Sequence, residues 1–535
     1  MKSLFFSYIL QRINQIKVSQ LLKEEQKLLS RVPFKDVLKD SFKDWSERER
    51  TVRCIHGGIK ARENFIYKIL PGFYFSNHNG KGWMKMNDKP TLVKSLTLHQ
   101  VVFMGLAWMT PMIYFTVYGV ASQAAGGMLA AAYVTAFIAI VFTAYSYSQM
   151  VKAYPISGSA YIYTKKAVHP IAGYLVGWAL LLDYIFSPII AILTFGIFMN
   201  TEFPSIPIFV WIIVMNFVLA IVNIVGIKSA ARVSGLSVLF QIAFIIIFCV
   251  LVAKDILTGQ TDSTSIFSLA PFFNDQLSVG GILSGAALIC FCFLGFDAVT
   301  TMAEETINAK KTIPKAIFLI VTIAVIMYVA ISYLSQLAYP DFTFKNPDNA
   351  AYSLVKLVGG NLLSSLFIMV LIVATFTQGV SSVTSVSRFL LALGRESILP
   401  KKLFTTIHPK FKTPVANIVF VSIISLSAVF INLDSAVLFV SFGALTAFTF
   451  VNLSVIFHYY IKLKRRSPKE TFMYLIFPLI GAGFIGWLLT LLNKETLVIG
   501  MSWVAVGFIY LMIKSKWEGA RNRKYPISNV KQIVD

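Results

Sequence analysis

The sequence lacks the motifs that mark nucleotide-driven pumps, zinc proteases and serine hydrolases. It has no GxxxxGK[ST] loop, which excludes an ATP-driven pump whose ATPase lies on this chain. It also has no HExxH motif and no GxSxG nucleophile elbow. We therefore expect a protein that is not an enzyme and that uses no cofactor.

Cysteine and histidine are scarce as well. The chain has four cysteines and no CxxC pair, and Cys249, Cys290 and Cys292 lie inside apolar stretches, as small buried residues do. The six histidines show no pair at metal-ligand spacing. We expect no metal site.

Hydrophobic residues dominate instead, at 56% of 535 residues with a mean hydropathy of +0.70. A soluble domain of this length has too little core to bury so much apolar surface. The apolar runs are continuous rather than alternating, and each is long enough, at about twenty residues, to cross a bilayer as a helix. The sequence predicts an all-α polytopic membrane protein.

The apolar runs predict about twelve transmembrane helices. The first six spans are expected near His99–Ser122, Met128–Met150, Pro170–Met199, Ile208–Ile227, Val238–Ala253 and Ile282–Ala303. The other six are expected near Ile317–Leu337, Leu362–Arg388, Val415–Asn432, Val437–Tyr460, Phe472–Leu492 and Leu497–Ile513.

The formal net charge of +23 has a membrane explanation. The basic residues lie between apolar spans rather than on one soluble face, so we exclude nucleic acid as a partner. With the N-terminus inside, the outer loops carry few lysines or arginines. These are Lys254, Lys345, Lys356 and Lys494. The asymmetry predicts a multi-pass protein of the cytoplasmic membrane with both termini in the cytoplasm.

The first 85 or so residues hold no spanning segment. The stretch Phe5–Leu29 has the pattern of a short amphipathic helix. Residues 1–85 are either a cytosolic extension that touches anionic lipid through its lysines, or a non-native stretch that precedes a true start at Met84 or Met86. The second interpretation is favoured. Residues 86–535 are then the transporter domain, with core spans in 95–460 and peripheral spans in 472–514.

Spans one and six each contain residues that interrupt a transmembrane helix. Span one carries Met-Thr-Pro-Met at 109–112, where the proline removes a backbone hydrogen bond. Span six carries Gly-Phe-Asp at 295–297, a glycine beside an aspartate deep in an apolar run. A simple kink and a packing glycine are the alternative explanations. Because the breaks are five spans apart, they predict a five-plus-five inverted-repeat (LeuT-like) core with helices 1 and 6 broken.

We expect the substrate between the two breaks, with free backbone groups from both helices and Asp297 as counter-charge. Tyr184 and Tyr161 are candidates for aromatic contact or gating. Asp183 either meets a polar neighbour in the bundle or lies near the outer interface. Glu304 and Glu305 are candidates for a gate, a salt bridge or a substrate contact. The predicted substrate-binding residues are Met109, Thr110, Pro111, Met112, Gly295, Phe296, Asp297, Tyr161 and Tyr184.

Several segments resemble the amino acid–polyamine–organocation superfamily, in order from about Gln100 to the C-terminal helix. They are Gly158–Tyr161, Gly177–Tyr184, Gly295–Thr306, Ile313–Ala316, Leu393–Arg395 and His408–Pro414. Within the superfamily, 105–112, 293–301 and 442–454 are most similar to bacterial putrescine importers. The resemblance implies uptake of a small amine by alternating access, driven by the proton-motive force, with H+ as the coupling ion.

The break in span one is consistent with an amine rather than an amino acid. Amino acid carriers of the superfamily hold the substrate carboxylate on a glycine-rich break, whereas Pro111 here offers no N–H group. A diamine would use carboxylates and aromatic faces instead. The chain departs from the putrescine importers at Thr116, where they carry an acidic residue, and Asp297 is also common in amino acid carriers.

Two other functions stay open at this stage. The first is a neutral amino acid permease or exchanger of the same superfamily. The second is a nutrient-sensing receptor that keeps the fold without transport, which a long cytosolic N-terminal extension would suit. The sequence does not specify the oligomeric state.

Overall fold

The computed structural model describes residues 75–76, 83–84 and 92–524, apart from 262–264, 274–277, 341–343, 345–346, 348–349, 491 and 493. The chain divides into two units, Met1–Lys89 and Pro90–Asp535. The described residues of the first unit form an antiparallel pair of strands, β1 (Phe75–Ser76) and β2 (Trp83–Met84). The helix expected at Phe5–Leu29 lies outside the described residues, and the role of residues 1–85 stays a prediction.

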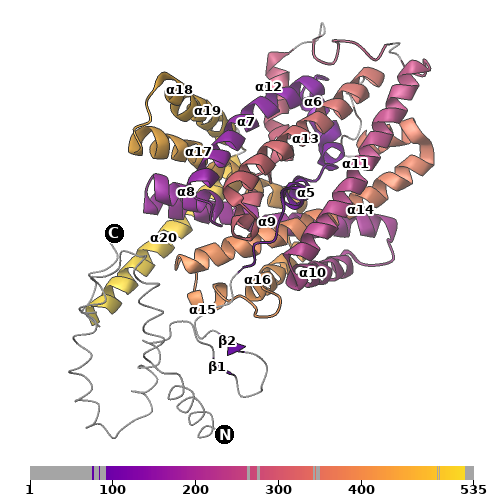
Figure 1. Cartoon of the computed structure of the whole chain (residues 1–535). Coiled ribbons are helices and arrows are strands. Elements are labelled where there is room, and N and C mark those ends of the chain that lie inside the picture. The colour runs from indigo at the N-terminus through magenta and orange to yellow at the C-terminus, as the bar shows by residue number, and fades with distance from the viewer. Residues whose placement is uncertain are drawn as a thin grey trace, which may run out of the picture. The chain divides into compact units, whose positions relative to one another are not determined.

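The second unit is built of helices that pack side by side (Figure 1). Its first half contains α5 (Leu98–Met109), α6 (Ile113–Ala124), α7 (Leu129–Ala153), α8 (Ser159–Ala167), α9 (Pro170–Glu202), α10 (Ile208–Val225) and α11 (Ile227–Leu257). The sixth predicted span contains α12 (Val279–Ile289), η1 (Cys290–Phe293) and η2 (Ala298–Glu305).

The helices of the second half begin after Glu305. They are α13 (Ala309–Ala338), α14 (Ala350–Arg395), α15 (Lys401–Phe404), α16 (Val415–Ser425), η4 (Leu426–Val429), α17 (Leu433–Val455) and η5 (Ile456–Lys462). The last are α18 (Pro468–Thr471), η6 (Phe472–Ile476), α19 (Phe477–Thr490) and α20 (Lys494–Lys524). In Figure 1, α18 and α19 lie at one edge of the bundle and α10 at the opposite edge.

Among the described residues, nine helices are long and apolar enough to cross a bilayer, and α5 with α6 forms a tenth span that is bent by 45°. Two shorter apolar helices, Val279–Ile289 and Val415–Val429, fall in the sixth and ninth predicted spans. In the second unit the described elements are helices, as the apolar runs predict. The expected class, a helical multi-pass membrane protein, is confirmed.

Two helices begin earlier than the hydropathy predicts. The start of α11 is Ile227 rather than Val238, so Lys228 and Arg232 lie in its first turns and not in a loop. The start of α13 is Ala309 rather than Ile317. In α14 the non-helical Gly359 and Gly360 separate two helices, and the second begins beside the predicted Leu362. Hydropathy marks the apolar part of a helix, whereas the backbone hydrogen bonds continue into the polar flank.

The break in the first span lies where the sequence predicts it. The helix α5 ends at Met109, and Thr110 has φ 57° and ψ 98°, outside the helical region. Pro111 explains the position, because a proline disfavours helical geometry in the residue before it. The Thr110 hydroxyl donates to the Ala107 carbonyl at 3.2 Å, which satisfies one of the groups that the break exposes.

The sixth span changes helix type at its break. After α12 and η1 the chain turns at Gly295, whose φ of +114° is open to glycine and strained for other residues. The chain then continues as the 3-10 helix η2. The sixth span is therefore broken at the residues that the sequence predicts. Its change to 3-10 geometry was not predicted, because hydropathy does not distinguish helix types.

Backbone hydrogen bonds join the start of the first span to the end of the sixth. The N–H groups of Ser95 and Leu96 donate to the Glu305 carbonyl at 2.8 and 2.9 Å. The N–H of Ile307 donates to the Leu96 carbonyl at 3.0 Å. The two broken spans are thus connected directly, although they are far apart in the sequence.

A pair of tryptophans attaches the last helix to α9. The rings of Trp178 on α9 and Trp503 on α20 stack with their centroids 5.3 Å apart. Each indole N–H donates to the backbone carbonyl of the other tryptophan, at 3.0 Å from Trp178 and 2.8 Å from Trp503. This reciprocal pair fixes α20 against α9.

Candidate functional site

The two breaks predicted from the sequence meet in the core of the bundle. A Cβ atom added to Gly295 would lie 1.9 Å from Cδ1 of Trp108, the residue that precedes Met109. A Cβ atom added to Gly105 would likewise lie 2.9 Å from a side-chain carbon of Val299 on η2. The absence of side chains at both glycines allows the first and sixth spans to approach this closely.

Asp297 is the charged residue at this meeting point. Its side chain is buried, with 2% of the residue exposed, and the Tyr184 hydroxyl on α9 donates to its Oδ2 at 3.2 Å. The carboxylate also lies against the backbone of Gly295 and Ala298, at the start of η2. Backbone N–H groups at a helix start stabilise a carboxylate, so the break itself holds Asp297 in place.

Aromatic rings form the wall beside Asp297. The ring of Tyr184 lies between Trp108 of α5, at a centroid distance of 5.6 Å, and Phe389 of α14, at 4.9 Å. Phe296 turns the other way and packs against Tyr147 of α7, with a centroid distance of 5.7 Å. Carboxylate and aromatic faces together are a combination that attracts an organic cation.

Several buried hydroxyl groups lie near Asp297 and beside one another. They are those of Tyr147, Ser159, Tyr163 and Thr300. Tyr147 lies within electrostatic range of Asp297, and Tyr163 lies beside Thr300 of η2. These hydroxyls give the buried carboxylate a polar surrounding inside an otherwise apolar bundle.

The structure brings together most of the predicted site residues. Met109, Thr110, Pro111 and Met112 are buried at the first break, and Gly295, Phe296 and Asp297 are buried at the second. Tyr184 joins them through its hydrogen bond to Asp297. The contacts of Tyr161 are with Gly177 of α9 and with Lys165 of its own helix, whose ammonium lies 5.7 Å from its ring centroid.

Trp108, Tyr147 and Tyr163 belong to the same region but were not among the predicted residues. Trp108 directly precedes the first break, so its position in the sequence is a usable signal. The proximity of Tyr147 and Tyr163 to Asp297 depends on the packing of α7 and α8, and nothing in the sequence indicates it.

Thr116, where the resemblance leads one to expect an acidic residue, does not face the buried core. The residue is exposed, and its hydroxyl donates to the Ile113 carbonyl at 2.8 Å. The missing acid therefore removes no charge from the cluster around Asp297.

Ion pairs join the end of η2 to α14. The Arg388 guanidinium donates to both oxygens of Glu305, at 2.7 and 3.2 Å, and both side chains are almost fully buried. Glu304 pairs with Arg395, which follows Arg388 by about two helical turns along α14. Of the three roles considered for Glu304 and Glu305, the structure supports the salt bridge.

Lys165 of α8 forms a third ion pair, with Glu396 at the end of α14. Partial burial lowers the pKa of Lys165, but its hydrogen bonds to Glu396 and Tyr161 outweigh burial, and the net pKa lies above the ordinary value. Lys165 therefore stays protonated near neutral pH. Together the three ion pairs connect α8, η2 and α14.

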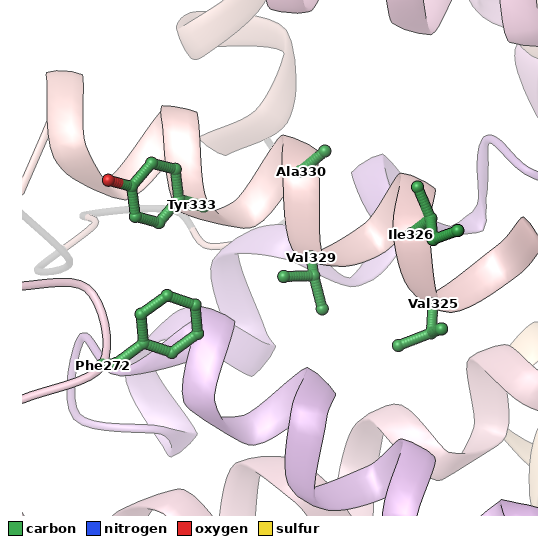
Figure 2. Close-up of a pocket in the computed structure, with 6 residues that line it drawn as sticks. All are labelled: Phe272, Val325, Ile326, Val329, Ala330 and Tyr333. Carbon is green, nitrogen blue, oxygen red and sulfur yellow. The ribbon is translucent and has the colours of Figure 1, made fainter. Parts of the chain in front are cut away.

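An apolar groove of about 470 Å³ lies along α13, away from these residues (Figure 2). Figure 2 shows Val325, Ile326, Val329 and Tyr333 on α13, with Phe272 opposite. None of the predicted site residues lines it, and its apolar walls are those of a lipid-facing helix surface. Among the described residues, no group of three or more His, Cys, Asp or Glu is arranged to hold a metal ion.

Comparison with known proteins points in one direction. Residues 100–520 match the family model for amino acid permeases. The chain is 37% identical over 427 residues to the low-affinity putrescine importer PlaP of Escherichia coli (strain K12), which covers 79% of this chain and 94% of that protein.

Two transporters of Bacillus subtilis (strain 168) are less similar. The methylthioribose transporter is 26% identical over 458 residues, covering 81% of this chain and 96% of that protein. The branched-chain amino acid permease BcaP is 25% identical over 467 residues, covering 82% and 96%. The names of the three relatives give different solutes, and the three are called an importer, a transporter and a permease.

Proposed function

Because the chain belongs to the amino acid permease family of the amino acid–polyamine–organocation superfamily, it is a transporter and not an enzyme, and we propose that it imports a small organic amine such as putrescine. The amine would cross the cytoplasmic membrane by proton-coupled secondary transport. The amine would bind between the two broken helices. Met109, Thr110, Pro111, Met112, Gly295 and Phe296 would supply backbone contacts, Asp297 the counter-charge, Tyr184 an aromatic face and Tyr161 a gating contact.

The environment of Asp297 carries this proposal. A carboxylate inside the bilayer is costly unless a positive charge accompanies it. The ion pairs of the described residues are Lys165–Glu396, Glu305–Arg388 and Glu304–Arg395, and none includes Asp297. An ammonium group of the substrate would supply the missing charge. Trp108 and Tyr184 offer the faces on which the rest of an amine would lie.

A neutral amino acid is the second candidate substrate, because the chain is also similar to a branched-chain amino acid permease. Such a substrate needs free N–H groups for its carboxylate. Pro111 has none, and the backbone at the start of η2 already faces the Asp297 carboxylate. The geometry therefore favours an amine over an amino acid.

The packing of the helices supports twelve spans with a five-plus-five inverted-repeat core formed by spans one to ten. If α5–α6 is span one and α12 to η2 is span six, equivalent contacts should occur twice. The packing of α9 against α17 then corresponds to that of α14 against α11, and α5 against α13 corresponds to α12 against α7. All four pairs are in contact. In this scheme the spans from α18 to α20 are peripheral.

The excess of basic residues in alternate loops supports an orientation with both termini in the cytoplasm. The ion pairs of Glu304, Glu305 and Lys165 then lie at the cytoplasmic end of the bundle. They would keep that end closed while the site is loaded from outside, and would separate when it opens inward.

Uptake of labelled putrescine into proteoliposomes under an inward proton gradient tests the proposal, with a neutral amino acid mixture as competitor. We expect putrescine uptake that the amino acids do not inhibit and that an uncoupler abolishes. Asp297→Asn should abolish uptake with little loss of membrane insertion. Asp255→Asn, a change at a buried aspartate that hydrogen-bonds Tyr339, is the matched control and should transport normally.

The other outcomes separate the alternatives. Transport of a competitor amino acid without putrescine uptake would identify the protein as an amino acid permease. Binding of a ligand with no uptake of either class would select the receptor. Normal putrescine uptake by Asp297→Asn would refute the counter-charge role.

A further inference from the structure

A second aspartate, Asp183, is buried in the bundle close to Asp297. It lies on α9 directly before Tyr184, is 3% exposed, and is within electrostatic range of Asp297. The Ser187 hydroxyl donates to its backbone carbonyl at 2.8 Å and approaches its Oδ1 at 3.3 Å. Of the two locations considered for Asp183, the polar neighbourhood inside the bundle is the one that the structure shows.

No ion pair of the described residues neutralises this second carboxylate, since those pairs involve Lys165, Arg388 and Arg395. The titratable groups that face Asp183 are Asp297 from the sixth span, Tyr147 from α7 and Tyr184 from its own helix. The helix α17 presents Gly443. Two carboxylates at short range in apolar surroundings repel each other when both are ionised.

The hydroxyl of Tyr147 supplies an independent observation. It is fully buried, lies within range of both Asp183 and Asp297, and interacts with the Ser159 hydroxyl. A hydroxyl both donates and accepts hydrogen bonds. It can therefore stabilise a carboxylate or a neutral carboxylic acid at the same position.

The packing around Asp183 limits what can bind there. A Cβ atom added to Gly443 would lie 2.7 Å from the Asp183 nitrogen and 3.1 Å from its Cβ atom. The helix α17 therefore lies directly against Asp183. On this side of Asp183 no room is left for a substrate, whereas a proton needs no additional space.

We propose that Asp183 binds the proton that is transported with the substrate, while Asp297 holds the ammonium group. This inference rests on the proposed function and locates its coupling ion. On the outer side a hydronium ion gives its proton to the Asp183 carboxylate, which forms the O–H bond of the carboxylic acid and leaves water. On the inner side this O–H bond breaks, and the proton passes to water as hydronium. The site closes only when Asp297 holds the ammonium group and Asp183 holds the proton. This requirement couples transport of the substrate to transport of the proton.

Two assays in the same proteoliposomes separate coupling from substrate binding. Counterflow of labelled against unlabelled putrescine needs binding and alternation but no gradient. Accumulation under an inward proton gradient, with the membrane potential clamped at zero, needs coupling. For one proton per substrate, each unit of pH gradient should give about tenfold accumulation in the wild type. Asp183→Asn should keep counterflow and lose the accumulation.

Ser187→Ala provides a second variant in case Asp183→Asn is not recovered folded. Removing a hydrogen bond to the carboxylate favours its neutral form, so the pH midpoint of uptake should move to higher pH with counterflow intact. Ser502→Ala, which removes a similar hydroxyl-to-backbone bond on the exposed side of α20, should leave the midpoint unchanged.

The outcomes of these assays separate the role of Asp183 from the identity of the substrate. Gradient-driven accumulation by Asp183→Asn at the wild-type level, or an unchanged pH midpoint in Ser187→Ala, would overturn the role of Asp183. Absence of putrescine counterflow in the wild type would instead refute the proposed substrate. The same two assays with the solute that is transported would then decide the role of Asp183.

Discussion

Gly295 and Trp108 touch across the two breaks, so closely that no other side chain fits at position 295 without moving the indole. The contact joins the turn of the sixth span to the last turn of α5. The ring of Trp108 in turn contacts Tyr184, the hydrogen-bond partner of Asp297. A change in either broken helix is therefore transmitted to the other and to the carboxylate.

Gly295→Ala should reduce the rate of uptake by at least about tenfold. The new methyl group would displace Trp108, and the φ of +114° would add about 1–3 kcal/mol of backbone strain. Initial uptake rates, normalised to reconstituted protein, measure the effect. Gly486→Ala is the control, because no atom lies within 4 Å of its added Cβ. Equal rates for both variants would show that the contact is dispensable.

Tyr184→Phe should raise the KM for the amine by about tenfold or more, with protein stability little changed. The variant keeps the ring but loses a buried hydrogen bond to a charged group, an interaction of about 1.5–3 kcal/mol. Concentration-dependent uptake gives KM and maximal rate separately. Tyr161→Phe is the comparison. A gating contact acts on the maximal rate rather than on binding, so the KM of this variant should stay within about twofold of the wild type. A larger increase in KM for Tyr161→Phe than for Tyr184→Phe would place the substrate near Tyr161.

Glu305→Gln should destabilise the protein more than Glu304→Gln does. Glu305 and Arg388 form a buried pair, and removing one partner leaves an uncompensated charge at a cost of about 3–5 kcal/mol. The Glu304–Arg395 pair is partly exposed and contributes about 0–1 kcal/mol. Thermal unfolding in detergent compares the two variants directly. Similar melting temperatures would mean that water reaches Arg388.

Removal of residues 1–83 should leave putrescine uptake unchanged. The family match begins at residue 100, and the predicted site is formed by residues that follow it in the sequence. Uptake by the shortened protein, compared with the full chain at equal insertion, is the measurement. Loss of transport with normal insertion would show that the N-terminal stretch takes part in function.

The sequence predicted those features of the site that a single residue type dictates. Pro111 determines where the first span breaks, and Gly295 with Asp297 determines where the sixth breaks, because each residue conflicts locally with an apolar helix. The class of fold follows from the length of the apolar runs in the same way.

What the sequence did not predict depends on contacts between distant helices. The proximity of Tyr147 to both aspartates, and the choice of Arg388 as partner of Glu305, arise from packing of spans that are far apart in the chain. The 3-10 geometry of η2 was missed because the side chains of Ala298–Glu305 are compatible with either helix type. Tyr161 and Tyr184 are both tyrosines in motifs of the superfamily, and only the fold separates their surroundings.

The reciprocal bonds between Trp178 and Trp503 make the C-terminal helix an internal reference for movement. Two hydrogen bonds and a stacked pair of rings mean that α20 follows any displacement of α9. A spectroscopic label on α20 would therefore keep a constant distance to a label on α9 throughout the cycle. The distance from α20 to α5 would report the movement of the broken helix relative to α9.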